Sequence, residues 1–436
     1  MSRIIKPCGR LRLFFLALIL AATAVTASAD AVTDWNQRAV TFSSTGGRPG
    51  PTWVLDVAVV QLAVYDAVQA IEGDYQPYCG SIPGASGSTR AAVARAARDV
   101  LVNRFSSPAQ TAAIIASYDA YVNGMDLNDP GFAVGAAAAQ CIIDLRANDN
   151  SFPAGWPAYH GGMAIGQWRP AASGPFTFSW LQDVTPFTMR SGDQFQVKPP
   201  PKLTSPEYTR AYNEVKDYGS LAGSLRTPEQ TDLANFWNGS FPGQFNKLAR
   251  DLAGSQGLNI SQSSRLMALV GVSMADSAIT AWDCKVVFDF WRPLSAIQFG
   301  NADGNPGTNG DPAWTPFVPT PPYSDYTSGA NNFSGSTTRA MSLFFDTNEM
   351  AFQIATTNPV PTVVDTRSYS SFSQVRDEVE DARILQGIHF RFADTDARRQ
   401  GEHIAQWAHS HFFRPVGESA ILFERVEAGL AKFAEL

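Results

Sequence analysis

The chain is poor in the residues that build disulfide frameworks, zinc sites and nucleic-acid surfaces. Its 436 residues include four cysteines, and no two are spaced as Cys-x-x-Cys, which argues against a zinc site. The 40 acidic residues outnumber the 33 basic ones, for a net charge of −7. A basic surface that could neutralise nucleic-acid phosphates is therefore missing, and we expect no nucleic-acid partner.

Long apolar runs are missing too, except near the N-terminus. Four basic residues among the first 12 precede an apolar run over 13–25, and Ala-Ser-Ala follows at 27–29. This order is typical of a cleaved secretory signal peptide over residues 1–29. The alternative is an uncleaved membrane anchor, but the apolar run is short for a span. We expect an exported protein, periplasmic or extracellular, whose mature chain has no membrane span.

The cysteines do not define a disulfide framework. Cys8 falls in the predicted signal peptide, which leaves Cys79, Cys141 and Cys284 in the mature chain. An odd set of three allows at most one intramolecular pair. The sequence does not indicate which pair forms.

Helical periodicity dominates the rest of the chain. Apolar residues recur at three- and four-residue spacing behind Ser and Thr N-caps, and no long segment alternates with the period of a strand. The pattern predicts an all-α fold of helical bundles. The predicted helices cover residues 52–73, 88–105, 107–123, 132–146, 206–218, 227–237, 245–252, 261–290, 333–345, 374–386, 394–411 and 418–433.

A long segment without helical periodicity divides the mature chain. Residues 147–205 are dense in glycine, proline and aromatic residues, and these aromatics need a surface to pack on. We expect this segment to cover part of the protein. It closes an N-terminal helical part over residues 30–206. A C-terminal helical part follows over residues 207–436, and we expect both parts to form one compact unit.

Three stretches of the C-terminal part carry the candidate chemistry. In CKVVFDFWRP, Lys285 and Arg292 are seven residues apart, which predicts that they share one face of a helix ended by Pro293. In YTSGANNFSG, Ser328 and Gly329 precede a predicted helix and could donate to an anion at its N-terminus. In ARILQGIHFRF, Arg383 and His389 flank Gly387, where we expect the chain to turn.

These side chains suit one kind of ligand. Three cations, a Ser-Gly turn and one histidine fit a tetrahedral or five-coordinate oxyanion, such as phosphate or vanadate. Arginine is well suited to the task because its guanidinium group presents a fork of N–H donors. The histidine would offer a ring nitrogen to the central atom of the oxyanion.

The order Lys-x6-Arg-Pro, Ser-Gly, Arg-x5-His resembles the vanadium-dependent haloperoxidase and type 2 phosphatidic acid phosphatase superfamily. The fit is closest to its bacterial haloperoxidase-like branch, and AVYDAVQAI and PPPKLTSPEYTRAYNEVKDYGS extend the resemblance over most of the mature chain. It implies that vanadate or phosphate is held by Lys285, Arg292, Ser328, Gly329 and Arg383. It also implies that His389 is the catalytic residue, either as axial vanadium ligand or as phosphatase nucleophile.

The sequence departs from the family pattern at two positions. The family places an acid–base histidine directly after Ser-Gly, where this chain has Ala330. The phosphatases place an aspartate four residues after the axial histidine, where this chain has Ala393, with Asp394 one position later. Loss of a general acid–base group costs about 10²–10⁴ in rate. The groups that could replace it are Asp325, Asp289 and the histidines at positions 160, 403, 409 and 411.

Three functions remain open on this basis. The first is a vanadium-dependent haloperoxidase that oxidises halide with hydrogen peroxide, with Tyr323 and Trp291 as candidates for setting halide choice. The second is an acid phosphatase that uses the same pocket on phosphate esters, with His389 as nucleophile. The third is a non-catalytic oxyanion-binding protein, because Ala330 replaces the acid–base histidine.

Overall fold

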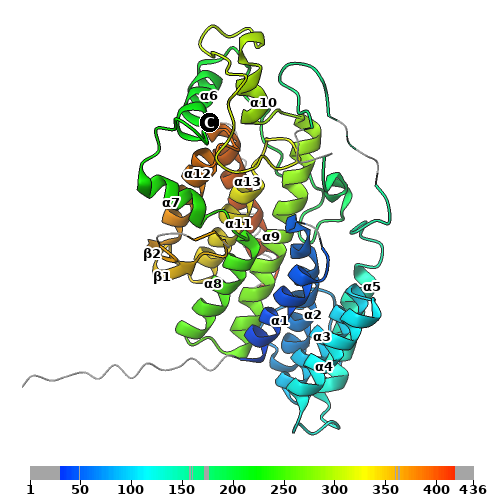
Figure 1. The fold of residues 1–436 in the computed structure, drawn as a ribbon. Coiled ribbons are helices and arrows are strands. Elements are labelled where there is room, and N and C mark those ends of the chain that lie inside the picture. The colour runs from blue at the N-terminus through cyan, green and yellow to red at the C-terminus, as the bar shows by residue number, and fades with distance from the viewer. Residues whose placement is uncertain are drawn as a thin grey trace, which may run out of the picture.

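The computed structural model describes residues 30–48, 50–156, 159, 161–170, 176–358, 360–361 and 364–417. The predicted signal peptide, His160 and the predicted helix over 418–433 lie outside these residues. The described part is helical apart from one hairpin, so the predicted all-α fold is confirmed (Figure 1).

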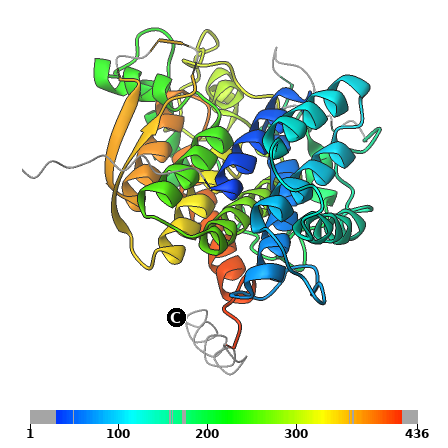
Figure 2. The same ribbon diagram turned by 90° about the horizontal axis from the view of Figure 1, so that it is seen from below.

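The N-terminal part is a bundle of five α-helices that lie side by side (Figures 1 and 2). Four of them match predicted helices, and the first was not predicted. Side-chain caps from Ser88 and Ser107 begin the third and fourth helices, as their sequence signals indicated. The elements are α1 (Ala31–Thr45), η1 (Gly50–Trp53), α2 (Val54–Glu72), α3 (Thr89–Arg104), α4 (Pro108–Val122) and α5 (Gly131–Leu145).

The C-terminal part builds a second group of helices around the long helix α9 (Ile260–Phe288). Helices α11 (Gly329–Phe344) and α13 (Arg391–His411) pack against α9 and against each other. The other helices are η2 (Ser179–Asp183), α6 (Pro206–Tyr218), α7 (Pro228–Phe236), α8 (Phe241–Ser255), α10 (Pro293–Gln298), η3 (Gly300–Ala302) and α12 (Phe372–Leu385).

One short hairpin was missed in the sequence. Strands β1 (Glu349–Ala355) and β2 (Thr366–Ser371) pair antiparallel between α11 and α12. Only two side chains of each strand are buried, so the alternation is too short to stand out from the sequence. The hairpin packs against α8 and α12 at the edge of the molecule.

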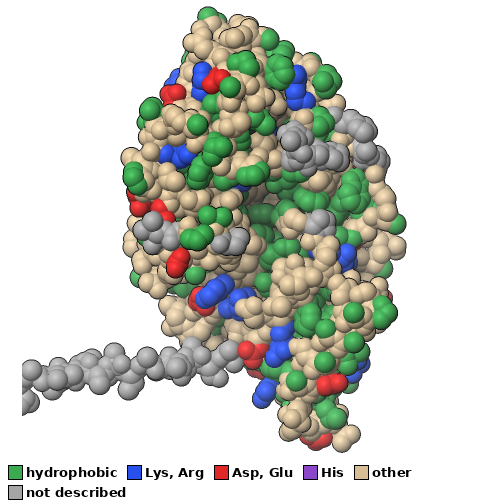
Figure 3. All heavy atoms as spheres, in the orientation of Figure 1, with side chains coloured by type: hydrophobic (Ala, Val, Ile, Leu, Met, Phe, Trp, Pro, Cys, Tyr) green, Lys and Arg blue, Asp and Glu red, His purple; other side chains and the backbone are tan. Residues whose placement is uncertain are grey.

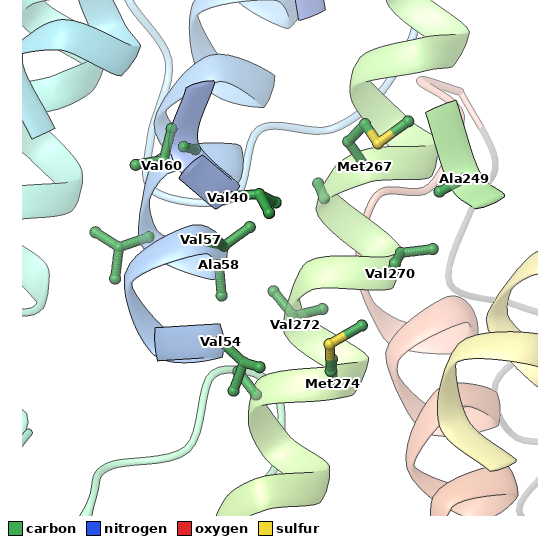
Figure 4. Close-up of a cluster of buried hydrophobic side chains, with 14 of the residues drawn as sticks. Val40, Val54, Val57, Ala58, Val60, Ala249, Met267, Val270, Val272 and Met274 are labelled. Atoms are coloured by element: carbon green, nitrogen blue, oxygen red, sulfur yellow. The ribbon is translucent and has the colours of Figure 1, made fainter. Parts of the chain in front are cut away.

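The two parts meet where α2 packs against α9. Their apolar side chains belong to one large core that extends through both parts, and a second core lies within the C-terminal part. Burying each valine or methionine contributes roughly 1.5–3 kcal/mol before the entropy of ordering is counted. Figure 4 shows this contact, with Val54, Val57, Ala58 and Val60 on α2 and Met267, Val270, Val272 and Met274 on α9.

Helix α2 is also the place where a membrane span could be suspected. Among the described residues, Gly50–Glu72 alone is long and apolar enough to cross a bilayer. Inside the protein, however, 89% of its most apolar window is buried. A helix buried in a protein core can have the same length and apolar composition as a membrane span.

A disulfide and the long loop complete the scaffold. Cys79 pairs with Cys141 and so ties the connection after α2 to α5, while Cys284 is a buried free thiol. The loop over residues 147–205 lies across α9, where the N–H groups of Phe187 and Thr188 donate to the buried carboxylate of Asp276 at 2.7 and 2.9 Å. Several of its aromatic residues are buried, as expected of a covering segment, among them Trp168, Phe176, Trp180 and Phe187.

Candidate oxyanion site

The C-terminal end of α9 separates the two cations of the first motif. Helix α9 ends at Phe288 because Asp289 adopts a left-handed conformation with φ of 47°. Lys285 is therefore in the last turn of α9, whereas Arg292 lies outside it, and Pro293 begins α10. The prediction that both cations share one helix face, ended by Pro293, is wrong. A turn of the backbone, and not helical spacing, brings them to the same place.

Lys285 holds the loop that leads into α11. Its Nζ atom donates to the carbonyl groups of Ser324 and Asp325 at 3.0 Å each, and to that of Thr327. An ammonium group has three N–H donors, so these carbonyls use all of them. Lys285 thus adds its charge to the site, and a direct bond to an oxyanion would replace one of these contacts.

The two arginines of the site each keep a donor atom without a partner. Arg292 donates from Nε to the Tyr323 carbonyl and from Nη1 to the Ile388 carbonyl, both at 2.7 Å. Arg383 donates from Nη1 to Gln386 Oε1 at 2.5 Å. Within the described residues, Arg292 Nη2 and Arg383 Nε are buried and have no hydrogen-bond partner. Buried donors of this kind could pair with a bound anion, because leaving them unpaired is costly.

His389 follows the turn that its motif predicted. Helix α12 ends at Leu385, and Gly387 takes a φ of +79° in which a Cβ atom would clash with the Gly219 carbonyl at 2.2 Å. The ring is almost fully buried, and its Nε2 atom lies 3.0 Å from Arg292 Nη1. A ligand at Nε2 would have to displace this guanidinium contact.

Asp325 lies behind the histidine. Its Oδ1 atom is 2.8 Å from His389 Nδ1 and 3.7 Å from Arg292 Nη1. The two residues are 64 positions apart in the chain, so no local pattern could pair them. This contact gives Asp325, one of the acids considered as a replacement base, a place inside the site.

Helix α11 brings Ser328 and Gly329 to the same centre. Ser328 is the N-cap residue, its N–H donates to the Ala393 carbonyl at 3.1 Å, and its side chain makes no capping bond to the helix. The hydroxyl instead hydrogen-bonds Asp394. Asn331 also donates to Asp394, at 2.7 Å. Asp394 therefore anchors the beginning of α11 to that of α13.

Burial decides the protonation of the site. It is the main cause that holds the pKa of His389 well below its ordinary value, and the charges of Arg292, Lys285 and Arg383 act in the same direction. The imidazole is therefore neutral at neutral pH, with a ring nitrogen free to act as a ligand or nucleophile. Burial and the charge of Arg292 likewise lower the pKa of Lys285 well below its ordinary value.

The two buried acids shift the other way. Burial raises the pKa of Asp325 to about 7, even though Arg292 and Lys285 oppose the rise. It raises the pKa of Asp394 well above its ordinary value, against the opposing hydrogen bond from Ser328. Burial therefore favours the protonated form of Asp394, which can donate a proton where Ala330 cannot.

The other candidate bases lie elsewhere. Asp289 accepts a hydrogen bond from Gly162 N at 3.0 Å, on the covering segment. Along the second half of α13, His403 lies beside Phe195, His409 beside Arg265 and His411 on the Trp407 ring. Of the two halide candidates, Tyr323 lines a cavity at the site, and Trp291 is fully buried in the core beside it.

Comparison with known proteins agrees with this arrangement. Residues 265–418, which carry all the predicted site residues, match the family described as the VCPO second helical-bundle domain. A vanadium chloroperoxidase of Curvularia inaequalis is 30% identical over 178 residues. The C-terminal part therefore resembles a domain of the vanadium haloperoxidases, which supports the predicted superfamily. The resemblance of the three motifs is thereby confirmed.

The haloperoxidase fold extends over most of the chain. A bacterial vanadium-dependent iodoperoxidase matches with a TM-score of 0.74 and 21% identity over 89% of this chain and 97% of its own. A bacterial vanadium-dependent chloroperoxidase in its holo form matches with a TM-score of 0.69 and 18% identity over 88% and 98%. The match to the Curvularia enzyme covers 33% of this chain and 28% of that protein, so its activity is not established for this chain.

Proposed function

We propose that this protein binds vanadate between α9, α11 and α12 and works as a vanadium-dependent haloperoxidase that oxidises halide with hydrogen peroxide. The observation that carries the proposal is the pair of buried, unpartnered guanidinium atoms, Arg292 Nη2 and Arg383 Nε, in the neighbourhood of His389. Phosphate, which has the same shape and charge, would compete for the same donors.

The residues present fit the cofactor. Arg292, Arg383 and the Gly329 N–H at the beginning of α11 would hold the oxygens of vanadate, together with the Ser328 hydroxyl. The neutral His389 would bind vanadium through Nε2, and Asp325 at Nδ1 would orient the ring and raise its basicity. When bound, vanadate acts as a Lewis acid that activates hydrogen peroxide for attack by halide.

The acid–base task passes to the protein's own carboxyl groups. Ser328 donates to the Asp394 carboxylate. When Asp394 is protonated this bond could reverse, so that Asp394 donates to Ser328 Oγ and the serine hydroxyl proton is available to an oxygen atom of the ligand. The pair could thus supply a proton where Ala330 supplies none. This route is longer than direct transfer from a histidine, so we expect slow turnover.

A phosphatase is the second candidate, and one contact favours it. A carboxylate 2.8 Å from the distal nitrogen of a buried histidine is an arrangement that activates and orients a nucleophilic ring. The phosphatases of the superfamily carry an aspartate four residues after this histidine. Here the position is Ala393, and Asp325 from the loop before α11 stands in space against the ring.

Export remains part of the proposal. The disulfide between Cys79 and Cys141 supports it, because such bonds persist mainly in oxidising compartments. N-terminal sequencing of the protein recovered from the periplasm or the medium should begin at Asp30. Full-length protein recovered from the cytosol or the membrane would contradict the proposal.

The test of function is bromide oxidation by the purified protein with hydrogen peroxide, with and without added orthovanadate. Vanadate binding, followed by calorimetry, should weaken at least tenfold in Arg383→Ala and His389→Ala, because each loses a charged or ligating contact. The control is Arg391→Ala: Arg391 is two residues from His389 but pairs with Glu214 and Asp381.

The outcomes separate the three functions. Vanadate-dependent bromide oxidation that is lost in His389→Ala supports the haloperoxidase. Hydrolysis of phenyl phosphate inhibited by vanadate, without bromide oxidation, supports the phosphatase. Tight vanadate binding without either reaction leaves the non-catalytic binder, and unchanged binding in both site variants would contradict the assigned site.

A further inference from the structure

The oxyanion site opens into a cavity that none of the proposed roles explains. The cavity has a volume of about 390 Å³ and reaches Arg383, Gly329 and Ala330. Figure 3 shows a hollow in the middle of this face, with hydrophobic side chains gathered around it. We call this cavity the mouth. Its aromatic lining comes from both parts of the chain: Trp53, Phe241, Trp282, Tyr323 and Phe333.

Neighbouring groups hold the rings of the mouth in place. Trp282 donates from its indole nitrogen to the Thr177 carbonyl at 3.0 Å, and its ring centre lies 5.0 Å from that of Tyr323. Phe241 stacks on Trp237 with ring centres 5.5 Å apart and planes 12° from parallel. The mouth therefore has a preformed apolar wall, as small-molecule sites usually do.

The same rings lie against the cations of the oxyanion site. Arg383 Cζ is 5.5 Å from the centre of the Phe241 ring, and Arg292 Cζ is 4.9 Å from that of Tyr323. Lys285 Nζ is 5.3 Å from the Tyr323 ring. A ligand whose anionic end meets these cations would thus have its other end among aromatic side chains.

Ala330 makes room for that other end. It stands in the first turn of α11, where the superfamily pattern has a histidine, and its side chain lines the mouth. A cavity of about 150 Å³ is enough to bind benzene. The mouth is more than twice that size, so one aromatic ring fits beside an oxyanion head group.

We propose that the mouth is a binding site for an aromatic organic anion, with the ring among Trp53, Phe241 and Tyr323 and the oxyanion on Arg383. The proposal rests on the proposed function, because it takes Arg383 as an oxyanion-binding residue. A bare halide or phosphate ion would gain nothing from the apolar wall. The ligand class is therefore a single-ring oxyanion or its ester, which would compete with vanadate for Arg383.

The test compares three probes that share a head group, with the whole mature protein and calorimetry. Phenylphosphonate carries a ring, methylphosphonate carries only a methyl group, and inorganic phosphate carries neither. We expect phenylphosphonate to bind about 10- to 100-fold more tightly than methylphosphonate, since it buries a ring. Equal affinities for the two phosphonates, with phosphate still bound, would overturn the mouth proposal and leave the proposed function standing.

Two variants locate the ring. Trp53→Leu removes an aromatic wall from the N-terminal part, and Ala330→Leu fills the mouth from α11. Each should reduce the affinity ratio of phenylphosphonate to methylphosphonate to about threefold or less. The control, Phe299→Leu, changes an aromatic residue that is 43% exposed and stacked with Arg169 outside the mouth, and it should keep the full ratio.

The remaining outcomes are also decisive. If both mouth variants keep the full affinity ratio of phenylphosphonate to methylphosphonate, the ring binds elsewhere and the proposal is overturned. Tighter binding of phenol than of phenylphosphonate would identify a neutral organic acceptor and overturn the anionic class. Absence of binding by all three phosphorus probes and by vanadate would overturn the proposed function together with this inference.

Discussion

Helices α2 and α11 are both buried, but they bury opposite kinds of side chain. All residues from Val54 to Gln69 of α2 are buried, and most are valine, alanine or leucine. The buried face of α11 is largely polar, with two asparagines, two serines and two threonines that are fully enclosed: Asn331, Asn332, Ser334, Ser336, Thr337 and Thr338. The two helices are therefore alike in burial. They differ in what their polar side chains contact.

The polar groups of α2 stabilise the fold. Asp56 pairs with Arg48 and Arg104 at 2.8 and 2.6 Å, and Asp66 accepts hydrogen bonds from the N–H groups of Tyr78 and Cys79. These contacts fix the chain around the N-terminal bundle. The buried polar side chains of α2 are thus few and, apart from the Gln61 amide, paired, as in ordinary protein cores.

The polar groups of α11 instead hold the candidate oxyanion site. Asn331 reaches Asp394, and Asn332 donates to Thr327 at 3.1 Å and to Gln400 at 3.2 Å. These bonds fix the loop before Ser328 and dock α11 on α13. An apolar helix in the position of α11 would be more stable. A buried helix with so many polar side chains therefore indicates a candidate functional site.

The largest effect we predict tests the missing group at Ala330. Ala330→His places an imidazole in the mouth, where the superfamily has its acid–base histidine, and the cavity leaves room for the ring. We expect vanadate-dependent bromide oxidation to rise by about 10²-fold or more, because a direct proton donor replaces the longer route through Ser328. The measurement is the initial rate at saturating vanadate.

A variant of similar size controls for shape. Ala330→Gln fills the same space but cannot exchange a proton near neutral pH, so its rate should remain near that of the natural protein. Equal gains from glutamine and histidine would show that space, and not proton transfer, limits turnover.

The second prediction separates stability from function between the two parts. The disulfide closes a 62-residue separation in the N-terminal part. Cys79→Ser together with Cys141→Ser should lower the free energy of unfolding by about 2–4 kcal/mol, measured by urea unfolding. Vanadate affinity should stay unchanged, because the site lies in the C-terminal part. A parallel loss of affinity would mean that the two parts are one cooperative unit around the site.

The third prediction concerns how closely α11 and α13 approach. A Cβ atom at Gly401 would lie 2.4 Å from the Asn332 carbonyl oxygen and 2.7 Å from Ser336 N, both backbone atoms of α11. Gly401→Ala should therefore cost about 1–3 kcal/mol of stability and weaken vanadate binding. At Gly80 an added Cβ meets nothing within 4 Å, so Gly80→Ala should change neither quantity. Equal unfolding midpoints for the two variants would show that α13 can move away freely.

Local signals in the sequence predicted much of this fold. The bounds predicted for α6 were those observed, and the capping box of Thr227 and Gln230 begins α7 as expected. Such helix ends depend on residues within one turn of each other. The predicted turn at Gly387 succeeded for the same reason, because glycine readily takes a positive φ.

The helix ends that were predicted wrongly depend on contacts between residues far apart in the sequence. Helix α11 begins at Gly329, four residues before the predicted position, because tertiary bonds from Asn331 and Asn332 outweigh the poor helix propensity of its first turn. Helix α9 ends before Arg292 through the left-handed Asp289, a residue whose local sequence gave no such sign. The site residues themselves remain predictions, although the fold brings them together.

The smallest effect we predict concerns pH and a buried acid of α2. Burial raises the pKa of Asp66 to about 6, although the Tyr78 and Cys79 N–H groups oppose the rise. The folded protein then binds more protons than the unfolded chain between about pH 4 and 6, so this contribution to stability is lost as the pH rises through 6. Between pH 5.5 and 7, the free energy of unfolding, measured by urea unfolding, should fall by about 1 kcal/mol more in the natural protein than in Asp66→Asn. Equal pH dependence of the two proteins would contradict the shifted pKa. We expect the vanadate affinity of Asp66→Asn to be unchanged, because Asp66 stabilises the fold, whereas Asp325 and Asp394 lie at the candidate site.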